Sequence, residues 1–113
     1  MSATARIVVT PTLTRDGGKT TAKIDDVASI HGFLRVKGAP DFTLLATLPA
    51  AMTVTFVIPD ISPGDYEFCA SETDKQDPAV TSALSPVSAF NVPEPVVALP
   101  ALDPPTVGDI SVA

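Results

Sequence analysis

Hydrophobic and polar residues alternate along most of the chain, and residues 52–58 carry the clearest example. Met52, Val54, Phe56 and Ile58 occupy one face of an extended segment, and threonines occupy the other. A period of two is typical of a half-buried β-strand, and no window shows the i, i+3, i+4, i+7 spacing of an amphipathic helix. The same reasoning predicts six further strands, at residues 7–10, 19–27, 30–37, 42–48, 66–70 and 85–92.

The predicted strands are short and are separated by turn signals, such as the Asp-Gly-Gly at residues 16–18. Short strands that recur about every 8–12 residues, with turns between them, are typical of an all-β sandwich. A chain of 113 residues has the size of one domain. We therefore expect residues 1–92 to form a seven-stranded antiparallel sandwich.

Proline marks a change of character after residue 92. The chain has 12 prolines among its 113 residues, about twice the usual share of ~5%, and five of them lie in residues 93–113. Because proline fixes φ and favours extended backbone, we predict an extended C-terminal arm over residues 93–113. Two interpretations stay open, a disordered tail and an arm that lies on a neighbouring subunit. Apolar residues in a segment too short to form its own core favour the second, and the residues expected to bind the partner are Val96, Val97, Leu99, Leu102, Val107 and Ile110.

The most specific motif is the sequence ISPGDY at residues 61–66. Pro63 presets φ for a turn, and Gly64 tolerates a positive φ. The motif resembles the E–F corner of fibronectin type III and other immunoglobulin-like domains, in which an aliphatic residue and Pro-Gly precede a tyrosine. The resemblance implies an immunoglobulin-like sandwich, with Ile61, Pro63, Gly64 and Tyr66 as a structural corner. It also implies that the tyrosine hydroxyl bonds back to the corner backbone.

The chain departs from this family pattern in three places. The tryptophan expected on strand B is missing, because the sequence at residues 23–27 is KIDDV. Phe68 stands where antibody-type domains carry a cysteine. On the strand predicted at residues 30–37, Leu34 and Val36 are expected to face inward.

Charge and hydropathy argue against two classes of partner. The net charge is −6 and the pI is about 4.4, which disfavours nucleic acid because binding there depends on Lys and Arg. No apolar run approaches the ~20 residues of a membrane helix, and the N-terminus does not resemble a secretory signal. Residues 1–40 carry a net charge of +3 and the remainder −9. This asymmetry has two interpretations, head-to-tail packing between copies and a fold that brings both signs side by side in one chain.

We find no constellation that predicts catalysis, a metal or a cofactor. The single cysteine, Cys69, and the single histidine, His31, exclude a disulfide framework and a Cys-based zinc site. A nucleophilic cysteine needs a nearby base, and nothing in the sequence places His31 beside Cys69. The acidic residues do not follow EF-hand spacing and are expected in solvated loops. With no Trp and one Tyr, a sugar-stacking platform is not predicted either.

The sequence thus predicts a non-enzymatic structural protein. Fibronectin-like domains usually act in tandem on exported chains, whereas here we expect one domain and no leader. A bacteriophage virion, assembled in the host cytoplasm, accounts for both observations. We expect a capsid decoration or surface protein whose partners are the major capsid protein or neighbouring copies, with a homo-oligomer in the assembly. The alternatives are an adhesion or carbohydrate-binding module of a bacterial surface protein, and a cytosolic accessory domain.

Overall fold

A computed structural model describes residues 3–94 and 100–112 of the chain. The fold is all-β and antiparallel, with two 3-10 turns, η1 (Asp16–Gly18) and η2 (Ile24–Asp26), as the helical elements of the described residues. The strands in chain order are β1 (Ala3–Val9), β2 (Thr14–Arg15), β3 (Thr20–Thr21), β4 (Val27–Val36), β5 (Thr43–Pro49), β6 (Val54–Ile61), β7 (Gly64–Asp74) and β8 (Ser88–Val92).

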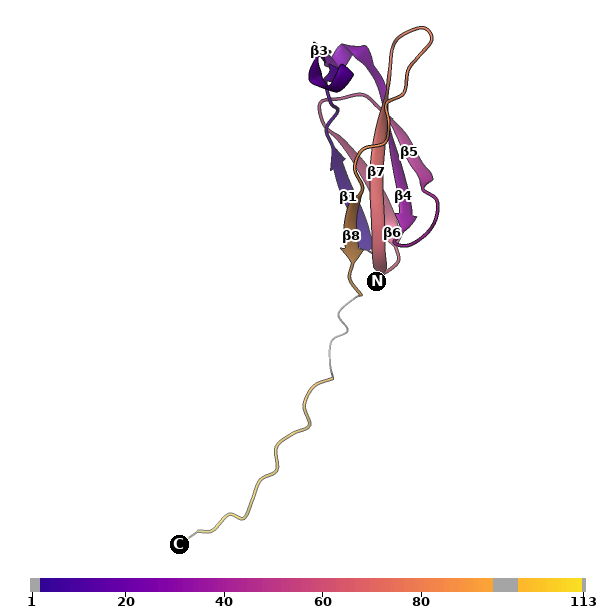
Figure 1. The fold of residues 1–113 in the computed structure, drawn as a ribbon. Helices are drawn as coiled ribbons and strands as arrows, with labels where there is room; N and C mark the ends of the chain where they lie inside the picture. The colour runs from indigo at the N-terminus through magenta and orange to yellow at the C-terminus, as the bar shows by residue number, and fades with distance from the viewer. Residues whose placement is uncertain (1–2, 95–99, 113) are drawn as a thin grey trace.

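Two sheets form the body of the molecule (Figure 1). The larger sheet has four strands in the order β5-β4-β7-β8, and the smaller sheet pairs β1 with β6. Every pairing in these sheets is antiparallel. Strands β2 and β3 form a separate two-residue ladder that closes at η1. The all-β prediction is confirmed, and the arrangement is consistent with a sandwich.

The hydrophobic core lies between the two sheets. Phe56 from β6 and Ile30 from β4 are both 1% exposed. The ring of Phe56 reaches Phe68 of β7, with the centroids 5.5 Å apart and the planes inclined by 55°. A Cβ atom on Gly32 of β4 would lie only 2.7 Å from Cε1 of Phe56. The ring therefore rests directly on the β4 backbone, and only glycine leaves room for it.

One predicted strand is wrong. Residues 19–27 contain the two-residue strand β3 and the turn η2 in place of a continuous strand. The N–H of Lys23 donates to Oδ2 of Asp26 at 2.8 Å, and the N–H of Asp26 donates to the carbonyl of Lys23 at 2.9 Å. These local bonds compete with strand formation. The described residues consequently hold eight strands, two of them very short, where the sequence predicts seven.

The other predicted strands are found with shifted ends. The first strand begins at Ala3 and ends at Val9, although the sequence predicts residues 7–10. The last strand begins at Ser88, and the preceding segment runs beside β7, where the Ser85 N–H donates to the Ala70 carbonyl at 2.7 Å. Leu34 packs against the core as expected. Val36 does not, because it ends β4 and is 59% exposed.

The C-terminal segment differs from the rest of the chain. After β8 ends at Val92, residues 100–112 contain no strand or helix, and their side chains are exposed. In Figure 1 this segment extends away from the end of the body at which β8 finishes. The expected partner-binding residues Leu102, Val107 and Ile110 are therefore open to solvent. The other three, Val96, Val97 and Leu99, lie outside the described residues.

Among the described residues, no helix is long and apolar enough to cross a membrane.

Candidate functional site

The corner motif lies at the turn between β6 and β7, at the lower end of the body in Figure 1. The hydroxyl of Tyr66 donates a hydrogen bond to the carbonyl of Ser62 at 2.8 Å, as the sequence predicts. The Tyr66 ring is stacked on Phe90 of β8, with centroids 5.6 Å apart. Ile61 is buried, whereas Pro63 is exposed and Gly64 has a φ of 149°. A φ of this sign favours glycine, so the Pro-Gly pair serves the turn between β6 and β7.

Polar contacts around the corner connect three strands at this end. The side-chain amide of Asn91 on β8 donates to Oδ1 of Asp65 on β7 at 2.8 Å. The Asp65 carbonyl accepts the N–H of Lys37, which follows β4, at 3.0 Å. The corner residues are thus part of the scaffold, and they fix the end of the body from which the arm leaves (Figure 1).

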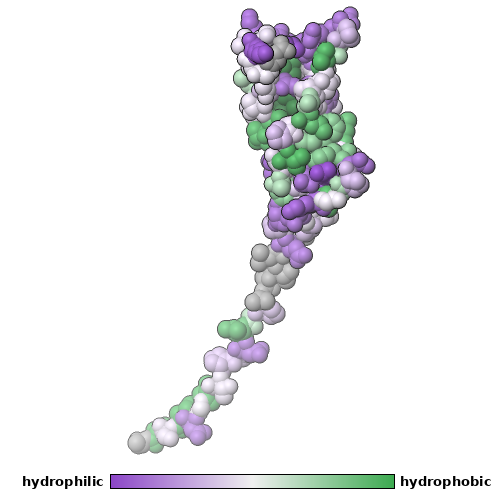
Figure 2. Space-filling model, viewed as in Figure 1, coloured by the Kyte–Doolittle hydropathy of each residue, from purple (hydrophilic) through white to green (hydrophobic). Residues whose placement is uncertain are grey.

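A groove runs along the open side of the body, between β1 and β8. It has a volume of about 480 Å³, and its lining includes Phe68 and Ile61 together with residues from both strands. A second hollow of about 350 Å³ is lined by the end of β1 and by residues that precede β8, namely Ser82, Ala83, Ser85 and Pro86. Figure 2 shows hydrophobic surface gathered over the middle of the body on the side where β1 and β8 are seen in Figure 1.

The burial of β1 explains why the groove is apolar. Residues 3, 5, 7 and 9 point inward but remain only half-buried, while Thr4, Arg6 and Val8 are exposed. On β6, by contrast, Val54 and Phe56 are buried. Among the described residues β6 is the strand partner of β1, and the other edge of β1 carries no ladder. The core is therefore incompletely covered along this edge.

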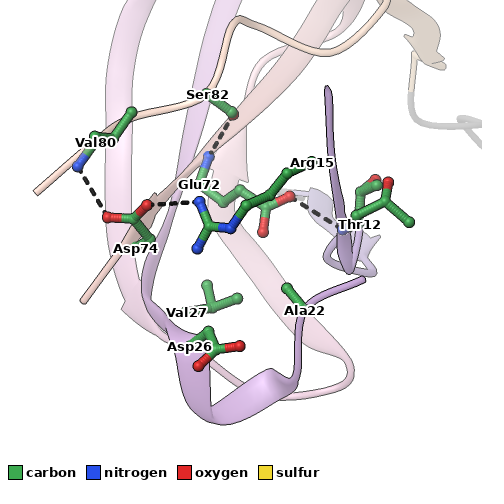
Figure 3. A pocket seen from close by; sticks show the side chains of 10 residues that line it. Thr12, Arg15, Ala22, Asp26, Val27, Glu72, Asp74, Val80 and Ser82 are labelled. Carbon is green, nitrogen blue, oxygen red and sulfur yellow. Dashed lines mark hydrogen bonds and ion pairs between the residues drawn. The ribbon is translucent and has the colours of Figure 1, made fainter. Parts of the chain in front are cut away.

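A polar pocket of about 290 Å³ lies near the opposite end of the body (Figure 3). Nη1 of Arg15 lies 2.9 Å from Oδ2 of Asp74, and the Asp74 carboxylate also accepts the N–H of Val80 at 2.9 Å. Oε1 of Glu72 accepts the N–H of Thr12 at 3.0 Å. The carboxylates of Glu72 and Asp74 thus accept hydrogen bonds from neighbouring segments, and these bonds connect the loops around the pocket to β7.

These contacts set the ionisation of Asp74. The backbone hydrogen bond from Val80 is the largest influence, followed by the side chains of Gln76 and Arg15, and together they hold the pKa of Asp74 well below its usual range. The carboxylate is therefore ionised at neutral pH and cannot act as a general acid there.

A line of hydrogen-bonding groups crosses the outer face of the larger sheet. Nδ1 of His31 on β4 lies 2.9 Å from Oγ1 of Thr47 on β5, and its Nε2 lies 2.7 Å from Oγ1 of Thr73 on β7. Oγ1 of Thr73 also lies 2.7 Å from Oγ1 of Thr81. Both ring nitrogens of His31 are engaged by threonines, so the imidazole is not free to activate a nucleophile.

Cys69 has the properties of a structural residue. It is 1% exposed, and burial raises the pKa of its thiol, with a smaller opposite effect from Arg35. A protonated, inaccessible thiol is a poor nucleophile. No group of three or more His, Cys, Asp and Glu side chains within residues 3–94 and 100–112 is placed to hold a metal ion.

No protein-family model matches the chain, and neither the curated proteins nor the solved structures contain one that is significantly similar to it.

The β1–β8 groove is the feature that sequence reasoning missed. The first strand predicted from the sequence begins at Ile7, so it leaves out the alternation that starts at Ala3. That alternation of inward Ala3, Ala5 and Ile7 with outward Thr4 and Arg6 is the signal that could have found the edge. The pairing of β1 with β6 is a long-range contact and has no counterpart in the local pattern.

Proposed function

We propose that this chain is a non-enzymatic structural protein of a bacteriophage virion, most simply a decoration protein on the outer capsid surface, held in place by its C-terminal arm. The observation that carries the proposal is the exposure of apolar side chains on the arm. Leu102 is 96% exposed and Val112 is 93% exposed, and Val107 and Ile110 are similarly open. Isolated soluble domains rarely display such a segment unless it meets a partner.

The energetics of docking favour an anchor. Burying one Val, Leu or Ile side chain completely is worth about 1.5–3 kcal/mol. The prolines at positions 100, 104 and 105 restrict the backbone to extended conformations, so less entropy is lost when the arm is ordered. A few apolar side chains on a stiff segment can therefore hold a small domain on a larger surface.

The arrangement of the larger sheet supports an immunoglobulin-like type for the domain. Strands β4, β7 and β8 lie side by side as strands C, F and G do in that fold, and β5 would correspond to an additional C′ strand. The hydrogen bond of Tyr66 to the corner backbone supports the same assignment. Strands β1 and β6 would then correspond to B and E, so strand B would lie at residues 3–9 and not at residues 23–27 as the sequence predicts. No strand A lies beside β1 among the described residues.

The alternative, an adhesion or carbohydrate-binding module of a bacterial surface protein, has less support. Protein sites for sugars commonly present an open aromatic face. Here the Tyr66 ring is stacked on Phe90, and the Phe42 ring lies beneath Arg35, whose guanidinium carbon is 4.0 Å from the ring centroid.

The test is the composition of purified phage particles from the host that carries this gene. We expect the full chain in a fixed ratio to the major shell protein. Absence of the wild-type chain from the particles would overturn the proposal.

A full-length variant tests the arm as the anchor. Replacing its exposed apolar residues by serine should leave the body folded but remove the chain from the particles. The residues replaced are Leu102, Val107, Ile110 and Val112. The matched control replaces the exposed apolar Val36 and Leu44 of the body by serine, and it should leave incorporation unchanged. Equal incorporation of the arm variant and the control would show that the arm is not the anchor.

A further inference from the structure

The open edge of β1 is the starting point. Strand β1 has seven residues, and within the described part of the chain it is hydrogen-bonded along one edge, to β6. The groove beside the other edge is bounded by β8, whose ladder is with β7. An unpaired edge next to an apolar groove is a template for one more strand.

The arm contains a segment suited to that place. Residues 106–112, with the sequence TVGDISV, form its longest described stretch without proline and match the seven residues of β1 in length. Four of the seven are β-branched Thr, Val or Ile, which favour strands. The alternation places Thr106, Gly108, Ile110 and Val112 on one face, and Val107, Asp109 and Ser111 on the other.

We propose that residues 106–112 of a second copy of this chain bind as an antiparallel strand along the free edge of β1 and fill the β1–β8 groove. The inference rests on the proposed role of the arm as an anchor, and it names a neighbouring copy in the assembly, in place of the shell protein, as the partner of residues 106–112. The register places Asp109 opposite Arg6. It follows that Val107 lies opposite Val8, and Ser111 lies opposite Thr4, on the solvent face.

The same register matches side-chain sizes on the inner face. Ile110 falls opposite Ala5, and Val112 falls opposite Ala3, so large arm residues meet small β1 residues. Gly108 falls opposite Ile7, where the size order is reversed. A parallel strand with Asp109 beside Arg6 would instead place Val107 beside Thr4 and Ser111 beside Val8, which mixes polar and apolar pairs. The antiparallel register is therefore favoured.

The arm of another copy is favoured over the chain's own arm. In this structure residues 100–112 extend away from the body and their side chains are exposed (Figures 1 and 2). The arm carries acidic residues and no Lys or Arg, whereas β1 carries Arg6 and no acidic residue. Because the arm and the groove are different surfaces, each copy can bind a neighbour at both, and the contact is head-to-tail.

A charge exchange tests the pairing in the purified full-length chain. Arg6→Asp and Asp109→Arg each place like charges opposite one another, and each should weaken self-association by about three- to tenfold in analytical ultracentrifugation. The double variant should restore it. Asp103→Arg changes the arm by the same charge outside the paired segment, and it should not be rescued by Arg6→Asp. Monomeric wild-type protein at all concentrations, or no rescue in the double variant, would overturn the inference.

Cysteine pairs test the register. Chains carrying Val8→Cys should form a disulfide with separate chains carrying Val107→Cys, and Thr4→Cys should do so with Ser111→Cys, because opposed strand residues bring their Cβ atoms into range. The crossed pairs, Val8→Cys with Ser111→Cys and Thr4→Cys with Val107→Cys, serve as matched controls. Preferential linkage of the crossed pairs, or an internal disulfide in a dilute Val8→Cys and Val107→Cys double variant, would overturn the inference.

The outcomes separate this inference from the proposed function. Self-association and disulfide formation are measured on the purified chain and do not need particles. If the chain is absent from particles but the register experiments succeed, the virion role fails and the strand pairing stands. If the chain is in particles but forms no intermolecular disulfide, the pairing fails alone.

Discussion

The two sheets of this protein use their strands differently. In the larger sheet β4 and β7 have a partner on both edges, and residues 68–71 of β7 are all buried. In the smaller sheet Val54 and Phe56 of β6 are buried to a similar degree, whereas the inward side chains of β1 remain half-buried. Phe56 of β6 contacts the larger sheet at the centre of the core. Side chains become less buried from this contact toward β1.

This difference separates stability from association. The contacts of Phe56 with β4 and β7 belong to the core of the single chain. The inward side chains of β1 are only half-buried in the single chain. An added strand along the free edge of β1 would therefore bury further apolar area there. Substitutions at the central contact should therefore change folding, and substitutions on the outer face of β1 should change assembly.

The largest expected effect is at the contact between the sheets. Phe56→Ala should lower the free energy of unfolding by about 3–5 kcal/mol, because it removes a buried ring and leaves a cavity. Val57→Ala on the same strand is the control, since Val57 is 50% exposed, and should change stability by no more than about 0.5 kcal/mol. Urea titration followed by circular dichroism measures both. If the two variants lost similar amounts of stability, the contact between the sheets would contribute no more to folding than the exposed surface does.

The next effect is at the glycine beneath that ring. Gly32→Ala should cost about 1–3 kcal/mol, because a Cβ atom there collides with Phe56 and the core is already filled. Combining it with Phe56→Leu should recover part of the loss relative to the sum of the two single variants, because the ring that collides is gone. The same urea titrations measure the coupling, and strict additivity would contradict a direct contact.

A smaller effect is expected at the corner. Tyr66→Phe should lower the free energy of unfolding by about 0.5–1.5 kcal/mol through loss of the hydrogen bond to Ser62. The acceptor is on an exposed residue, so water can replace the lost donor. Thermal unfolding measures the change, and self-association should be unaffected. A large change in self-association would show that the corner is part of the interface.

The smallest effect is expected only at acidic pH. It concerns the ion pair between Arg15 and Asp74. Because the pKa of Asp74 is lowered on folding, ionised Asp74 stabilises the fold fully above the ordinary carboxyl value of about 3.9. That contribution is lost as pH falls from there toward the folded-state pKa. The stability difference between wild type and Asp74→Asn should shrink below about pH 4 in thermal unfolding experiments. Asp25→Asn, on an exposed residue of η2, is the control, and an unchanged difference would contradict the pKa shift.

Much of the fold could be predicted because its strands have strong local patterns. Val54 and Phe56 alternate with threonine and valine on a half-exposed strand, and burial follows that alternation. Met52, which the sequence places on the same face, precedes β6 and is 55% exposed. Residues 19–27 could not be read in this way. They include the η2 turn, in which the N–H of Lys23 donates to the carboxylate of Asp26. Such a side-chain bond depends on local geometry that residue spacing does not determine.

The candidate site could be predicted only in part. The hydrogen bond of Tyr66 follows from a motif within a few residues, so the sequence was sufficient. The exposure of Leu102, Val107 and Ile110 is expected from proline content and is found in the described part of the arm. The groove depends on which strand lies beside β1 and which edge is left without a ladder, and those are contacts between distant parts of the chain.

The connection between β7 and β8 lies at the end of the body opposite to the arm (Figure 1). Residues 75–79 in it are exposed, while Asp74 is held by the backbone of Val80 and closes the base of the loop. If the arm fixes the chain to a surface, this loop is the part that meets the surroundings first. A peptide inserted between Asp77 and Val80 would then be presented at the end of the body opposite to the arm (Figure 1).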